Sequence, residues 1–259
     1  DRAMRILLEI CCGSAEDAIL ACRAGAERVE LNSDLFHGGL TPTLGSLLTV
    51  KKAAPPLEVM AMVRPREGGF CYTETEYAVM KEDARLLLEN GADGLVFGFL
   101  HENGTVDAER TSEFARLTAR YGKKSVFSRA IDVVPDWRAA LDTLIAAGIT
   151  RVLTSGQRPT APEGADTIAA MVRHAAGRIE ILPGSGVRAA NARQLITRTG
   201  CTQVHMSAHG MVCDLSAANE HGICFTGSDI PPDGRYKRVD PARVAEVLQL
   251  LKGDADVSF

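Results

Sequence analysis

RAGAERVEL, residues 23–31, is the first of four stretches with one arrangement, the others being ENGADGLVF (89–97), AAGITRVLT (146–154) and RTGCTQVHM (198–206). In each, a helix-like segment runs into a glycine, and an apolar segment follows. Glycine adopts the left-handed conformation that ends a helix without a Cβ clash, and the β-branched residues after it fit a buried strand. Gly25, Gly91, Gly148 and Gly200 lie 66, 57 and 52 residues apart (91−25, 148−91, 200−148). One βα unit takes roughly 25–30 residues, so the repeat predicts every second strand.

Apolar segments between the repeats supply the other strands: MRILLEICC (4–12), EVMAMVRP (58–65), SVFSRAI (125–131) and RIEILPGSG (178–186). Apolar residues at helical spacing predict helices at 15–24, 74–89, 108–121, 137–147, 163–175 and 241–252. Eight alternations predict an α/β fold, a (βα)8 TIM barrel. A doubly wound sheet uses the same alternation, but it would need a phosphate-binding glycine loop where this chain has CCGS (11–14). We assign residues 4–259 to a single barrel domain and residues 1–3 to an expression remnant.

Composition is that of a cytoplasmic globular protein. Of the 259 residues 46% are hydrophobic and 24% charged, and the net charge of −4 gives no electrostatic basis for binding nucleic acid or an anionic membrane. The sequence shows neither a signal peptide nor an apolar run that could span a bilayer. Its seven cysteines, an odd number without a CxxC pair, predict reduced thiols. Cys11 and Cys12 are adjacent, so on an extended strand they point to opposite faces and cannot bind one metal together.

Charged and polar residues interrupt the apolar runs at the predicted C-terminal ends of the strands, where barrels place their sites. The candidate catalytic residues are Glu9, Glu30, Asp132 and His205. The candidate substrate-binding residues are Arg64, Arg66, Arg129, Ser155, Gly184, Gly186 and Ser207. Charges inside strands cost free energy unless they pair or contact a ligand, so the alternative to a ligand site is a structural ion network.

The acidic and basic residues of these strand ends, rather than the cysteines, form the predicted functional centre: Glu9, Glu30, Arg64, Arg129, Asp132 and His205. Glu9 and Glu30 lie on adjacent predicted strands. One of them should therefore have a raised pKa unless an arginine lies between them. Residues 209–239 show neither helical nor strand periodicity, and so long an irregular connection predicts a lid or a subunit contact.

Several blocks, in order along the chain, resemble the CutC family: LLEICCGSAEDA, GAERVEL, GGLTPTLG, VRPREGGFCYTETE, GADGLVFGFL, FSRAID, RVLTSGQ, PGSGV and VHMSA. The resemblance implies a cytoplasmic (βα)8 barrel, a homodimer, and a role in copper homeostasis with Cu(I) as the bound metal. It implies Cys11 as a metal ligand, helped by Cys12, Met206 or His205.

The chain departs from the family pattern at three positions. Asn32 and Met206 stand where the family commonly has cysteine, and Ser128 stands where it commonly has histidine. A thiolate pair suits Cu(I), whereas an asparagine amide oxygen does not. The second hypothesis is therefore an enzyme of unknown reaction on a small polar or anionic metabolite. In that hypothesis Arg64 and Arg66 hold the anion, and the strand-end carboxylates and His205 transfer protons.

Overall fold

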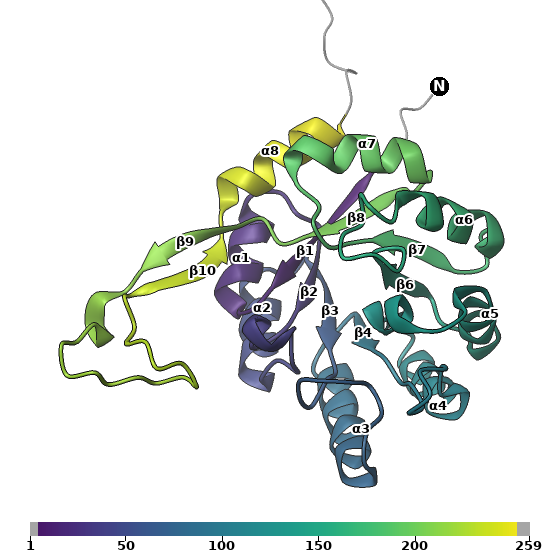
Figure 1. The fold of residues 1–259 in the computed structure, drawn as a ribbon, viewed down its shortest axis with the longest axis horizontal. Coiled ribbons are helices and arrows are strands. Elements are labelled where there is room, and N and C mark those ends of the chain that lie inside the picture. The colour runs from purple at the N-terminus through teal and green to yellow at the C-terminus, as the bar shows by residue number, and fades with distance from the viewer. Residues whose placement is uncertain (1–4, 253–259) are drawn as a thin grey trace, which may run out of the picture.

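The computed structural model describes residues 5–252 and contains a nearly closed barrel of eight parallel strands surrounded by helices (Figure 1). The strands are β1 (Leu7–Cys12), β2 (Arg28–Leu31), β3 (Glu58–Met62), β4 (Gly94–Phe97), β5 (Lys124–Phe127), β6 (Arg151–Thr154), β7 (Glu180–Pro183) and β8 (Gln203–Met206). Their hydrogen-bonded order is β7-β6-β5-β4-β3-β2-β1-β8. Within residues 5–252 no backbone ladder joins β7 to β8. Instead the Gln203 amide donates to the Glu180 carboxylate at 3.0 Å. The predicted (βα)8 barrel is confirmed, and the remnant assigned to residues 1–3 lies outside the described residues.

A helix follows each barrel strand, with the arm described below standing between β8 and the last of them. The helices are α1 (Ala15–Arg23), α2 (Leu44–Ala53), α3 (Glu74–Glu89), α4 (Ala108–Arg120), α5 (Trp137–Ala147), α6 (Ala165–Ala175), α7 (Ala189–Thr199) and α8 (Pro241–Leu251). As predicted, Gly148 and Gly200 end α5 and α7 in the left-handed conformation, with φ of 81° and 74°. In the part of the chain that the structure describes, no helix is both long and apolar enough to cross a membrane.

Strand alternation separates two environments on β1. Ile10 and Cys12 face outward and belong to the large apolar core between strands and helices. Glu9 and Cys11 face the barrel interior, where they meet side chains of β2 and β8. Their parity therefore brings one carboxylate and one thiol into the interior of the barrel.

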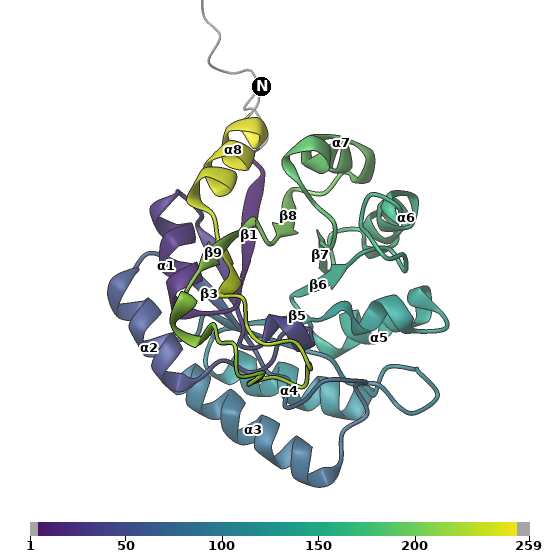
Figure 2. The same ribbon diagram turned by 60° about the vertical axis from the view of Figure 1, so that its left-hand side comes forward.

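The segment 209–239, called the arm below, is a hairpin that projects from the barrel after β8 (Figures 1 and 2). It pairs β9 (His209–Cys213) with β10 (Arg235–Val239) in antiparallel register. The expectation of no strand in this segment was wrong. Both faces of most of the hairpin are exposed, so its strands do not need the apolar alternation by which a half-buried strand is recognised.

Candidate metal centre

The register of β1 with its neighbours places Glu9 between Arg28 of β2 and His205 of β8. All three side chains are buried, and each oxygen of Glu9 has its own partner. Arg28 Nε donates to Glu9 Oε2 at 2.5 Å, and His205 Nδ1 lies 2.7 Å from Glu9 Oε1. Glu9 thus pairs with the Arg28 charge and fixes the orientation of the His205 ring.

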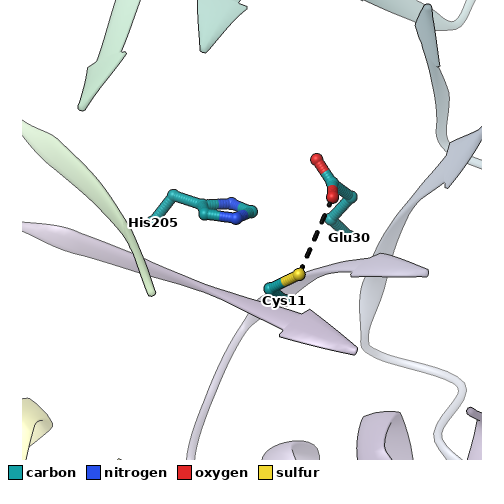
Figure 3. Close-up of side chains that lie close together, drawn as sticks. All are labelled: Cys11, Glu30 and His205. Atoms are coloured by element: carbon teal, nitrogen blue, oxygen red, sulfur yellow. Dashed lines mark hydrogen bonds between the residues drawn. The ribbon is translucent and has the colours of Figure 1, made fainter. Parts of the chain in front are cut away.

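Next to this pair, three potential metal ligands converge from different strands: Cys11 of β1, Glu30 of β2 and His205 of β8 (Figure 3). Their ligand atoms all lie within 4.8 Å of one another. Cys11 Sγ is 3.9 Å from Glu30 Oε1, while Glu30 Oε2 is buried without a hydrogen-bond partner among the described residues. Because Nδ1 of His205 contacts Glu9, Nε2 is the ring nitrogen left for a ligand. In residues 5–252 this is the one group of three or more histidine, cysteine or acidic side chains arranged in this way.

The two glutamates have opposite electrostatic environments. Burial raises the pKa of Glu9, but the Arg28 charge and the His205 hydrogen bond outweigh it and hold that pKa at about 2. Burial raises the pKa of Glu30, and the nearby Glu9 charge adds to this effect. This agrees with the expectation that one of two adjacent carboxylates titrates high. Burial alone would lower the pKa of His205, yet Glu30 and Glu9 raise it well above 6.5.

Asn32 connects the thiol and the carboxylate of the cluster. Its amide nitrogen lies 3.0 Å from Glu30 Oε1 and 3.7 Å from Cys11 Sγ, and it also donates to the Cys12 carbonyl at 3.2 Å. Burial raises the pKa of the Cys11 thiol. The Asn32 side chain therefore positions two of the candidate ligands and supplies no sulfur of its own.

Asp132 is part of a separate group at the ends of β5 and β6. Its carboxylate accepts from Arg129 Nε at 2.8 Å, Thr154 Oγ1 at 2.6 Å and the backbone nitrogens of Ser155 and Gln157 at 2.9 and 3.2 Å. Arg129 also donates to Ser155 Oγ at 2.7 Å. With so many donors directed at it, Asp132 organises the loop after β6.

Arg64 and Arg66, which follow β3, bind backbone carbonyls of loops. Arg64 donates to the carbonyl oxygens of His37 and Gly68, at 3.0 and 2.9 Å. Arg66 donates to the Gly69 carbonyl at 3.0 Å and forms an ion pair with Glu76 at 2.7 Å. Both guanidinium groups thus donate to carbonyls of the loops after β2 and β3, which leaves the predicted anion clamp without support.

The remaining predicted residues are dispersed. Gly184 lies against the cluster, since a Cβ at this position would come within 3.1 Å of His205 Cδ2 and 2.7 Å of Leu153. Gly186 packs against Thr160, while Ser207 is exposed just after β8. Ser128 is buried, and its hydroxyl accepts from the Ala130 nitrogen at 3.3 Å.

Cys12 and Met206, named above as helpers of Cys11, cannot act as such. Both belong to the outer apolar core between strands and helices. Both side chains face outward because side chains alternate along a strand, and each of these residues directly follows an inward-facing residue of the cluster.

Sequence reasoning missed two features of the site. Arg28 was overlooked, although it lies two residues before Glu30 and shares its face of β2. His209, the first residue of the arm, contacts the Cys11 carbonyl at 3.0 Å. The buried Asp17 accepts from the Val239 nitrogen at 2.8 Å, so both ends of the arm are attached near the end of β1. No local pattern could have indicated these long-range contacts.

Fold and site together define a (βα)8-barrel protein with a half-buried thiol and a buried imidazole and carboxylate at the C-terminal ends of adjacent strands. The model of the CutC family matches residues 6–210, and the chain belongs to this family. A CutC family protein of Treponema denticola is 53% identical over 247 residues, covering 95% of this chain and 98% of that protein. The human protein named copper homeostasis protein cutC homolog is 43% identical over 224 residues, 86% of this chain and 78% of that protein.

Solved structures agree with the fold. The crystal structure of CutC from Streptococcus agalactiae aligns with a TM-score of 0.74 and 35% identity, covering 78% of this chain and 98% of that one. The 3-hexulose-6-phosphate synthase of Salmonella typhimurium aligns over 95% of this chain and 99% of that one, with a TM-score of 0.59 and 15% identity. At that identity the likeness shows the barrel fold alone.

Proposed function

We propose that this protein handles copper and binds a copper ion among Cys11, Glu30 and His205. The observation that carries the proposal is the convergence of three ligand atoms within 4.8 Å. A thiolate and an imidazole are ligands that Cu(I) accepts. Glu9 supports the site in the way that second carboxylates support metal-bound histidines, by fixing the ring and its tautomer. The human and mouse relatives are named copper homeostasis protein cutC homolog, which points to the same role.

An anaerobic titration of Cu(I) against a chromophoric competing chelator tests this proposal. Cys11→Ser should lower the affinity at least about tenfold, because it removes the single sulfur of the cluster. Cys71→Ser, at an exposed cysteine, is the matched control and should bind as the parent does. Equal affinity of the parent and Cys11→Ser would remove the cluster as the copper site.

We also propose a cytoplasmic location, supported by seven cysteines that are all free thiols in the structure. A homodimer that forms through the arm is our further proposal. The arm carries six large hydrophobic side chains that are at least half exposed or close to it: Met211, Leu215, Ile223, Phe225, Ile230 and Tyr236. Such a concentration is typical of an interaction surface. Light scattering should give a dimer for the parent and a monomer after residues 217–232 are replaced by a short turn, whereas an unchanged mass would exclude the arm.

The enzyme hypothesis receives less support. Its anion clamp gains no support, because Arg64 and Arg66 donate to loop carbonyls. Asp132, one of its acid–base candidates, is saturated by hydrogen bonds.

A further inference from the structure

We propose that the cluster of Cys11, Glu30 and His205 binds a divalent cation of borderline softness, of which Zn²⁺ is the type, more tightly than it binds Cu(I). This inference rests on the proposed metal centre and names the class of ion that this centre selects. Three observations carry it: the donor atoms, the formal charges of the ligands, and the hydrogen bonds around them.

The donor set contains one sulfur, one nitrogen and one carboxylate oxygen. Zn²⁺ accepts all three in its tetrahedral sites, and a site with three protein ligands leaves a fourth position for water or another ligand. Cu(I) is soft, so the oxygen of Glu30 is a poor ligand for it and two useful donors remain. A second sulfur is not within the cluster, since Cys12 and Met206 face the outer core and Asn32 fills the position beside Cys11.

The formal charges of the bound ligands also fit a dication. A bound cysteine is a thiolate and a bound glutamate a carboxylate, so Cys11 and Glu30 bring two negative charges. Glu9 does not change this balance because the buried Arg28 neutralises it. A dication therefore gives a neutral buried site, whereas a monocation leaves one uncompensated negative charge where burial is costly.

The hydrogen bonds around Glu30 leave one of its carboxylate oxygens available to a metal ion. Asn32 donates to Oε1 of Glu30 at 3.0 Å, while Oε2 is buried and has no partner in the described part of the chain. A buried carboxylate oxygen without a partner loses the hydrogen bonds it would make in water, which costs free energy. A cation bound at Oε2 removes that cost.

The experiment compares Zn²⁺ and Cu(I) on the same variants, with Co²⁺ as the spectroscopic substitute for Zn²⁺. The parent protein with Co²⁺ should show a thiolate-to-cobalt charge-transfer band and the intense visible bands of a tetrahedral site. Cys11→Ser should lose the thiolate-to-cobalt charge-transfer band. Glu30→Gln, nearly isosteric, should weaken Zn²⁺ at least about tenfold and change Cu(I) affinity less than about threefold. Glu109→Gln, at an exposed acid on α4, is the control and should change neither.

The outcomes separate this inference from the proposed copper role. Tight Cu(I) binding without Zn²⁺ or Co²⁺ binding would overturn the inference and leave the copper role standing. Zn²⁺ binding without Cu(I) binding would uphold the inference and overturn the copper role. If Glu30→Gln fails to fold, the cobalt spectrum of the parent decides alone. A spectrum without the thiolate band refutes the mixed-donor site.

Discussion

Replacing Glu9 by glutamine should destabilise the protein more than any other single loss of a surface or site carboxylate. The carboxylate of Glu9 is the counter-ion of Arg28, and the side chains of both are only 3% exposed. Its pKa is lowered from 4.5 to about 2, which at about 1.4 kcal/mol per unit amounts to about 3 kcal/mol at neutral pH. Breaking a buried pair also leaves the partner charge uncompensated, for a total loss of about 3–5 kcal/mol.

Urea denaturation followed by circular dichroism measures this loss. Glu89→Gln is the matched control, because it breaks an exposed ion pair with Arg85 of 2.8 Å and should cost less than about 1 kcal/mol. The double variant Glu9→Gln with Arg28→Met removes both charges and should recover part of the stability. A loss for Glu9→Gln no larger than that of the control would refute the electrostatic role of this buried pair.

The pH dependence provides a second check on Glu9. The pKa of Glu9 is lower in the folded than in the unfolded protein, so its contribution is complete above pH 4.5. It is lost as the pH falls toward about 2. The stability difference between the parent and Glu9→Gln should therefore shrink on acidification. A difference that grows between pH 5 and pH 3 would contradict the assignment.

Three other variants are expected to separate structural from ligand-binding roles. His205→Gln should show the opposite pH trend. The raised pKa of His205 gives stability that is complete below pH 6.5 and is lost as the pH rises through the folded-state pKa. Denaturation of the parent and of His205→Gln at pH 6 and pH 9 measures this difference in stability. Asp132→Asn should lose about 2–3 kcal/mol with metal affinity unchanged, since its partners lie at the ends of β5 and β6. Urea denaturation and metal titration in parallel check this, and a lowered metal affinity would contradict it. Arg64→Met should lose about 1–3 kcal/mol through its three loop carbonyl bonds and leave Cu(I) binding as in the parent. A loss of Cu(I) binding without a loss of stability would place Arg64 in the site.

The barrel could be predicted because its signals are local. Gly148 ends α5 as predicted, and α3 and α5 run over the predicted residues, Glu74–Glu89 and Trp137–Ala147. Each signal depends on a few neighbouring residues. The hairpin of the arm was missed because its strands pair with each other in solvent, where neither face must be apolar.

The site could be predicted only in part, for a different physical reason. Charges within apolar strands identified Glu9, Glu30 and His205, because such charges need a partner. Which partner each one finds depends on the register between strands, and this is not encoded in any one segment. The same limit applies to Arg64, whose guanidinium binds backbone carbonyls that are indistinguishable from other carbonyls in the sequence.

Arg28 makes the roles of Glu9 and Glu30, on neighbouring strands, different. Arg28 pairs with Glu9, which stays ionised and holds the His205 ring, so Glu9 belongs to the framework of the site. Within residues 5–252 no arginine pairs with Glu30, whose Oε2 has no hydrogen-bond partner and whose Oε1 lies 3.9 Å from Cys11 Sγ. Stability and ligand binding should therefore respond to different residues: loss of Glu9 acts first on folding, while loss of Glu30 removes a buried oxygen without a partner and acts first on the metal.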